Sequence, residues 1–185
     1  MGGIRVDTGM RTSIPHLFAA GEAVGGANGA NRLSGNAITE ALTFGRCAGE
    51  CAAALASGTS LPTLSPATPG GSRPDLNPAA AIVELQSVMN RHVGPLRTGA
   101  GLEQALAHIR SLEVDLPAPK QGLDPEWVDL HDLRNMRLVA ECVTRAALAR
   151  EESRGAHQRE DFAETDAAWQ RHQVIRLEDG SCKLT

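Results

Sequence analysis

The residues whose types and spacing could do chemistry lie between Leu17 and Arg46, where the sequence reads LFAAGEAVGGANGANRLSGNAITEALTFGR. Glu22 ends a short apolar run, and a Gly- and Asn-rich stretch that contains Arg32 follows it. A carboxylate at such a position can accept hydrogen bonds from sugar or polyol hydroxyls. An arginine in a glycine-rich loop can bind a carboxylate through two parallel hydrogen bonds.

A helix predicted over residues 36–56 adds the third part of this candidate site. Asn36 is its expected N-cap, and the backbone N–H groups of Ala37 and Ile38 then lie in a first turn that can hold an electron-rich or anionic group. Gly35 allows a ligand to approach the backbone closely. A glycine-rich loop before a helix is also typical of phosphate-binding loops, so these residues alone do not identify the ligand.

The elements that must position these residues are short. Residues 2–7 and 16–22 are predicted strands, and small residues recur along the predicted helix, at Ala41, Gly45, Ala48 and Ala52. Such a stripe favours close packing against a sheet. We therefore expect residues 1–56 to be the C-terminal part of an α/β cofactor-binding domain.

A change of composition divides the rest of the chain. Residues 57–78 are rich in Pro, Gly and Ser and are predicted to be a linker or mobile loop. Residues 79–185 are expected to form a helical C-terminal domain, with three main helices in a bundle and a terminal hairpin. The hairpin turn is predicted at residues 178–181, which read Glu-Asp-Gly-Ser.

Apolar residues recur at helical spacing in three parts of this C-terminal region. The Asp124–Pro125 pair predicts the start of the third helix. The residues expected to face inward are, in chain order, Ile82, Leu85 and Met89; then Leu102, Ala105, Leu106, Ile109 and Leu112; then Leu130, Leu133, Val139, Val143, Ala146 and Ala147.

Composition excludes several classes of protein. The chain has 185 residues and a net charge of −4, which argues against nucleic-acid binding by bulk attraction. No apolar run is long enough for a membrane span, and no secretory signal is visible. Cys47 and Cys51 share a helix face, but no second pair of ligands accompanies them, so small-residue packing is preferred over a metal site. The four cysteines suit a reducing, cytoplasmic compartment.

The order of the motifs resembles the succinate dehydrogenase and fumarate reductase flavoproteins, a family that includes L-aspartate oxidase. The segments that carry the resemblance are MGGI at 1–4, AAGE at 19–22, GANRLSGNA at 29–37, EALTFGR at 40–46, LRNM at 133–136 and ESRGAH at 152–157, with Trp169 and His172 in the tail. The resemblance covers almost the whole chain apart from residues 57–78.

The resemblance implies a C-terminal part of an FAD-dependent oxidoreductase that transfers hydride between FAD and a dicarboxylate. It assigns Glu22 to hydroxyls of FAD, the segment Asn36, Ala37 and Ile38 to the flavin edge, and Arg32 and Gly35 to a substrate carboxylate. It places no catalytic residue in this chain, because the proton-donating arginine and the dinucleotide-binding motif would lie upstream of residue 1. The chain alone is therefore expected to be inactive and not to retain FAD.

The same resemblance implies partners and a location. The partners are a dicarboxylate substrate, an iron–sulfur electron-transfer subunit and the missing N-terminal flavin-binding region or subunit. Through such partners a cytoplasmic protein could sit at the inner face of a membrane. Three departures from the family pattern, Asn28, Ala37 and Ala163, leave the identity of the dicarboxylate open.

Each candidate residue also has a structural alternative. Arg32 could form an internal salt bridge, and Glu22 could cap a strand end. Glu152, Arg154 and His157 could form an acid–base group, but the resemblance favours docking of the helical domain onto the flavin domain. The remaining histidines are expected to be surface or packing residues. The rival function is a non-catalytic module, or a split-enzyme subunit that packs against a separate flavin-binding polypeptide.

Overall fold

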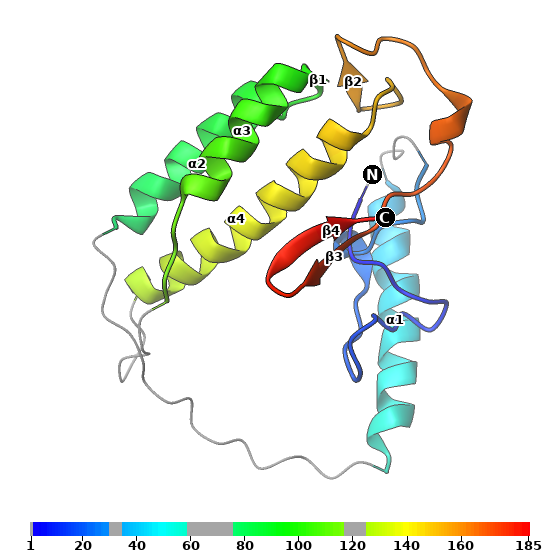
Figure 1. Ribbon diagram of the computed structural model, residues 1–185. Coiled ribbons are helices and arrows are strands. Elements are labelled where there is room, and N and C mark those ends of the chain that lie inside the picture. Colours follow the sequence, from blue (N-terminus) through cyan, green and yellow to red (C-terminus); the bar gives the residue numbers. More distant parts are fainter. Residues whose placement is uncertain (1, 30–34, 59–75, 117–124) are drawn as a thin grey trace. The chain divides into compact units, whose positions relative to one another are not determined.

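The computed structural model of the chain describes residues 2–29, 35–58, 76–116 and 125–185. The chain divides into two compact units, Met1–Ser65 and Pro66–Thr185. The first unit runs from blue to cyan in Figure 1 and the second from green to red. Most of the predicted linker at 57–78, like the predicted N-cap residue Asp124, lies outside the described residues.

The first unit contains the 3-10 turn η1 (Gly21–Ala23) and the helix α1 (Asn36–Ala56). The two pack together at Gly21, where an added Cβ would lie 3.7 Å from both Cα and Cβ of Ala41. This contact uses one of the small residues that recur along the helix. No residue of α1 is buried, and Ile38 and Leu42 are 71% and 70% exposed.

The two strands predicted in this unit form only as isolated bridges. Ile4 pairs with Val24 in parallel, and Arg11 pairs with Phe18 in antiparallel orientation. Positive φ angles at Met10, His16 and Gly21 turn the backbone before either segment can extend. The expectation of regular strands over 2–7 and 16–22 is therefore wrong for the described residues.

The second unit is built on three helices: α2 (Pro78–His92), α3 (Gly99–Ser111) and α4 (Pro125–Ala149). The side chains of Asn77 and Thr98 cap α2 and α3 by accepting hydrogen bonds from the N–H groups of Ala80 and Gly101, both at 3.1 Å. Proline stands at the first position of α2 and of α4, where its missing N–H costs nothing.

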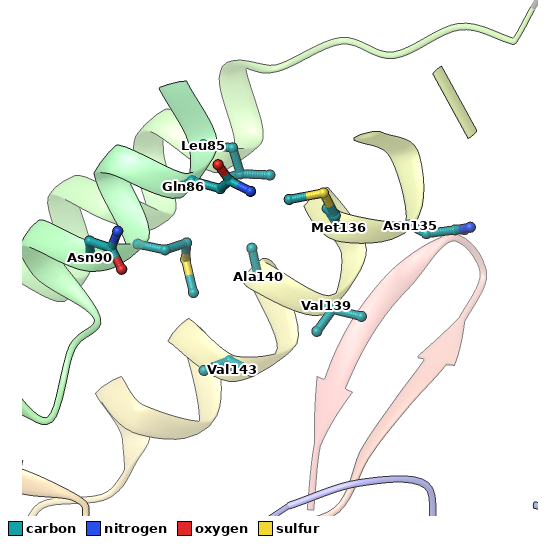
Figure 2. Close-up of a pocket in the computed structure, with 9 residues that line it drawn as sticks. Leu85, Gln86, Asn90, Asn135, Met136, Val139, Ala140 and Val143 are labelled. Atoms are coloured by element: carbon teal, nitrogen blue, oxygen red, sulfur yellow. The ribbon is translucent and has the colours of Figure 1, made fainter. Parts of the chain in front are cut away.

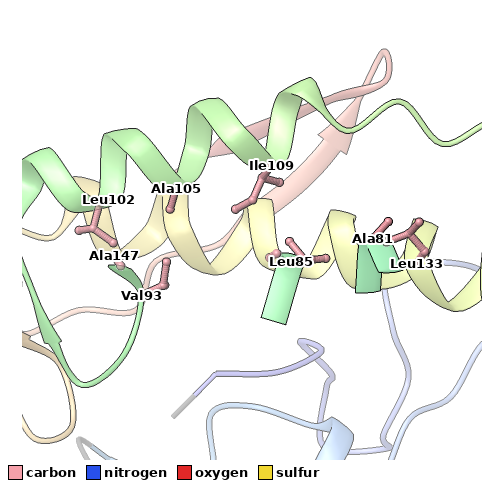
Figure 3. Close-up of a cluster of buried hydrophobic side chains, with 9 residues drawn as sticks. Ala81, Leu85, Val93, Leu102, Ala105, Ile109, Leu133 and Ala147 are labelled. Carbon is pink, nitrogen blue, oxygen red and sulfur yellow. The ribbon is translucent and has the colours of Figure 1, made fainter. Parts of the chain in front are cut away.

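The three helices enclose one apolar core, which Figure 3 shows in close-up. Leu85, Leu102, Ile109 and Leu133 are at most 1% exposed at its centre. The inward faces predicted for α2 and α3 are largely confirmed, because Leu102, Ala105, Leu106 and Ile109 are all buried.

The inward face predicted for α4 is only partly correct. Leu130, Leu133 and Ala147 are buried, whereas Val139 and Val143 are 60% and 42% exposed. The two valines line an open groove between α2 and α4 with a volume of about 610 Å³ (Figure 2). The helix buries Ala140 and Thr144 in their place, and the Thr144 hydroxyl is satisfied by donating to the Ala140 carbonyl at 2.8 Å.

Short strands complete the second unit. β1 (Leu96–Arg97) pairs in parallel with β2 (Gln158–Arg159). β3 (Ile175–Glu178) and β4 (Ser181–Leu184) form the predicted C-terminal hairpin. Its turn residues Asp179 and Gly180 both have positive φ, as a two-residue hairpin turn requires. A second 3-10 turn, η2 (Ala167–Trp169), precedes the hairpin.

Over the described residues the chain therefore has four α-helices and a few short strands. This exceeds the three main helices expected for the bundle, because α1 belongs to the first unit. In the described part of the chain no helix combines the length and apolar character needed to cross a membrane.

Candidate functional site

The N-terminus of α1 is the central feature of the candidate site. Its N-cap is Gly35, with φ 94°, and the helix proper begins at Asn36. The prediction that Asn36 caps the helix is thus wrong by one residue. The reason is that the chain enters the helix through a left-handed conformation that glycine adopts without strain. Nothing lies within 4 Å of a Cβ built on Gly35, so conformation rather than crowding selects glycine there.

A glycine N-cap leaves the first turn of α1 without a side-chain cap. The first N–H groups of a helix have no partner within the helix and carry a partial positive charge. Asn36 and Ile38 are exposed and Ala37 is half-buried. This helix end can therefore accept an electron-rich ligand edge from solvent.

The structure brings the turn that carries Glu22 against the same helix. Glu22 lies in η1, which packs on α1, and its side chain is exposed. The loop that follows is tied to the helix where the Asn28 Nδ2 donates to Glu40 Oε2 at 3.4 Å. Arg32 lies outside the described residues, so the structure places Glu22, Gly35, Asn36, Ala37 and Ile38 but not Arg32.

The second unit holds a separate cluster of arginines and carboxylates that contains the ESRGAH segment. Glu152 is fully buried and binds Arg150 and Arg154 at 2.6 and 2.8 Å. It also accepts the backbone N–H of Asp166 at 3.0 Å. Hydrogen bonds, first of all from Arg154, lower the pKa of Glu152 to about 2 against the opposing effect of burial.

His157 is held on both ring nitrogens. Arg97 lies 2.8 Å from Nδ1 and can only donate, so Nε2 carries the proton and donates to the Arg150 carbonyl at 3.2 Å. Burial lowers the pKa of His157, and the positive charge of Arg97 acts in the same direction. A neutral imidazole with both nitrogens engaged has the contacts of a structural residue.

Arg159 and Asp161 belong to the same cluster and connect two helix ends. Arg159 is 3% exposed and donates to the carbonyls of Ala147 and Leu148, both at 3.0 Å, at the C-terminus of α4. Asp161 pairs with Arg159 at 2.7 Å and accepts the N–H of Gly99 at the start of α3. The ion pair thus places a cation at one helix C-terminus and an anion at another helix N-terminus.

Sequence reasoning singled out Glu152, Arg154 and His157 but missed Arg97, Arg150, Arg159 and Asp161. No spacing rule could have found Arg97, because it meets His157 across α3 and α4. Arg159 and Asp161 mostly bind backbone atoms, which leave no mark in a sequence. In the part of the chain that the structure describes, no three His, Cys, Asp or Glu side chains gather as metal ligands would.

Comparison with known proteins identifies the family. The sequence model described as "Fumarate reductase flavoprotein C-term" matches residues 83–185, just over half of the chain. The chain belongs to the succinate dehydrogenase and fumarate reductase flavoprotein family. Residues 1–38 match the model described as "FAD binding domain". The chain thus corresponds to the C-terminal part of a larger FAD-dependent flavoprotein of this family.

Individual relatives agree with this assignment. A fumarate reductase (CoM/CoB) polypeptide of Methanothermobacter marburgensis is 40% identical over 186 residues, which cover 92% of this chain and 34% of that protein. L-aspartate oxidase of Rhodospirillum rubrum is 42% identical over 177 residues, covering 91% and 57%. The solved Mycobacterium smegmatis Sdh1 in complex with UQ1 matches with a TM-score of 0.80 at 35% identity, covering 99% of this chain and 34% of that chain.

The described residues fit the FAD that this family implies. Glu22 offers an exposed carboxylate to hydroxyl groups, and the uncapped start of α1 offers N–H donors to an electron-rich ring edge. The chain spans between 34% and 57% of the two curated relatives named above, so a complete site would need further residues.

Proposed function

We propose that this chain forms one side of the active site in an oxidoreductase that transfers hydride between FAD and a dicarboxylate. The observation that carries the proposal is the uncapped N-terminus of α1, entered through the left-handed Gly35 directly after the sequence GANRLSG. FAD supplies the hydride chemistry when it is bound, and the protein supplies position and charge.

In this proposal each residue has a distinct task. Ala37 and Ile38, with Asn36 beside them, present backbone N–H groups to the flavin pyrimidine edge. There they favour the added negative charge of the reduced form. Glu22 accepts hydrogen bonds from FAD hydroxyls. Arg32 binds a carboxylate of the substrate in a bidentate manner, and the N–H of Gly35 approaches the same carboxylate.

The proposal includes an organisation and partners. Residues 1–56 complete an FAD-binding domain, 57–78 link it to the helical domain, and 79–185 form that domain. The rest of the flavin site comes from an N-terminal region or subunit, and an iron–sulfur subunit carries the electrons onward. The similarity to a fumarate reductase polypeptide and to Sdh1 supports this arrangement, with a cytoplasmic protein held at the inner membrane face by its partners.

The test uses a protein that includes the upstream FAD-binding region. Arg32→Ala should lower kcat/KM for the dicarboxylate by about 30- to 1000-fold, as expected for a lost charged hydrogen bond. Arg32→Lys should recover little, because lysine lacks the planar fork. The matched control is Arg46→Ala, whose side chain is 81% exposed and pairs only with Glu50 in the described structure. Normal dicarboxylate kinetics in Arg32→Ala would overturn the proposed clamp.

The rival function is a non-catalytic module, or a split subunit completed by another polypeptide. The exposed Ile38 and Leu42 on α1 favour a packing partner in either case. We expect the 185-residue chain alone to bind no stoichiometric FAD after purification, measured by flavin absorbance before and after denaturation. Tightly held FAD in the chain alone would contradict the need for a partner. Failure of an upstream region to restore flavin binding would favour the non-catalytic module.

A further inference from the structure

The second unit contains a pair of thiols from distant parts of the sequence. Cys142 lies on α4 and Cys182 on β4, and their sulfur atoms are 3.8 Å apart. Cys182 is 5% exposed, while Cys142 is half-buried and reachable from solvent. All four cysteines of the chain are free thiols in this structure. The pair therefore joins an accessible sulfur to a buried one.

Cys182 is also the residue through which the C-terminal hairpin meets α4. In Figure 1 the hairpin lies beside α4, with which β4 is in contact. Leu177, the cross-strand partner of Cys182, is 59% exposed. The Cys182 carbonyl accepts a hydrogen bond from Arg145 Nη1 at 2.9 Å, and Arg145 in turn pairs with Glu141. A covalent bond at this position would reinforce an attachment that rests on few polar contacts in the described structure.

We propose that Cys142 and Cys182 form a redox modification site, where a hydroperoxide oxidises the two thiols to a disulfide that fixes the C-terminal hairpin to α4. The accessible Cys142 sulfur attacks the peroxide and becomes a sulfenic acid, with release of water or an alcohol. The Cys182 sulfur then displaces the hydroxyl group, which leaves as water with the remaining thiol proton. Two thiols lose two electrons, and the peroxide bond accepts them.

The geometry leaves a short movement to make. A disulfide needs its sulfur atoms about 2.0 Å apart, and the present separation of 3.8 Å can close by side-chain rotation and a small shift of the hairpin. Burial, followed by the hydrogen bond with Cys182, raises the pKa of the Cys142 thiol to about 11. The pair therefore stays reduced with ordinary cellular thiols and responds only to sustained oxidant.

The test is peptide mapping of the full chain after treatment with hydrogen peroxide. Trypsin places Cys142 in the peptide 138–145 and Cys182 in the peptide 177–183. The expected product is these two peptides joined, two hydrogens lighter than their sum and separated by dithiothreitol. The oxidised chain should also unfold at a temperature about 5–10 °C higher, because the bond closes a long loop.

Two variants sharpen the result. The double variant Cys47→Ser/Cys51→Ser keeps the proposed pair and should give the same linked peptide and the same rise in unfolding temperature. Cys182→Ser should lose both. Separate peptides carrying independent oxygen adducts on Cys142 and Cys182 would overturn the proposal. So would a linked peptide with no change in unfolding temperature. The mapping of the unsubstituted chain decides the matter even if Cys182→Ser fails to fold.

Discussion

The backbones of Gly3 and Gly25 cross in direct contact. A Cβ placed on Gly3 would lie 2.5 Å from the Gly25 nitrogen, and one on Gly25 would lie 2.6 Å from the Gly3 nitrogen. The crossing is fastened by the Gly25 N–H, which donates to the Ile4 carbonyl at 3.1 Å, and by the Ile4 N–H, which donates to the Ala23 carbonyl at 2.8 Å. This contact holds the start of the chain beside the turn that carries Glu22.

We expect Gly25→Ala to force the two segments apart. Because both neighbours are backbone atoms, relief requires a backbone shift costing about 1–3 kcal/mol. Hydrogen exchange at the Ile4 amide should become about 5- to 100-fold faster. Gly2→Ala is the control, since nothing lies within 4 Å of its added Cβ. Equal exchange in the two variants would show that the crossing tolerates a side chain.

The revised inward face of α4 gives a second prediction. Leu133→Ala removes a fully buried side chain from the core and should lower the free energy of unfolding by about 2–5 kcal/mol. Val139→Ala, at a position that is 60% exposed in the α2–α4 groove, should cost less than about 1 kcal/mol. Urea unfolding followed by far-ultraviolet circular dichroism measures both. Similar losses for the two variants would restore Val139 to the core.

Glu152 gives a stability change with a defined pH dependence. Glu152→Gln leaves Arg150 and Arg154 without their shared carboxylate and should cost about 2–4 kcal/mol near neutral pH. The pKa of Glu152 falls from its ordinary 4.5 to about 2 on folding. Its contribution is therefore complete above about pH 5 and is lost as the pH falls toward 2.

The measurement is urea unfolding of both proteins at several pH values. The gap between the unsubstituted chain and Glu152→Gln should narrow steadily below about pH 5. Glu151→Gln, at the exposed neighbouring position, should change stability by less than about 0.5 kcal/mol at any pH. A gap that stays constant down to pH 2 would mean that the buried charge is not what stabilises the cluster.

His157 should remain neutral at a pH where an ordinary histidine is half protonated. A proton added at Nδ1 would face the guanidinium of Arg97 at 2.8 Å, in a site where burial already lowers the pKa from 6.5. The unfolded chain binds this proton more readily, so stability should decline as the pH drops below about 6.5. NMR titration of the ring should give a midpoint below that value, and a midpoint above it would contradict the assigned contacts.

Much of the second unit could be predicted because its helices have clear boundaries and one apolar face. Leu102, Ala105 and Ile109 recur at the spacing of a single buried stripe, and Gly180 supplies the turn that the hairpin needs. On α4 the same reasoning chose Val139 over Thr144. A buried hydroxyl satisfied by its own helix looks polar in a sequence but costs little in the core.

The candidate site was predictable only in outline. The resemblance led to Glu22 and to residues 35–38, and the structure places each of them, but the entry into α1 depends on the backbone conformation of Gly35. Periodicity cannot report a φ angle. The Arg159–Asp161 pair was missed for a related reason, since its partners are the backbone atoms of two helix ends.

The parallel pairing of β1 with β2 has a consequence for the order of folding. It joins Leu96 to Gln158 and Arg97 to Arg159, so it encloses both α3 and α4. The entropy of closing so long a loop is recovered only after those helices have packed. Arg159 and Asp161 should then engage the helix ends in the last step. Substitutions at this clamp should accelerate unfolding and leave the folding rate almost unchanged.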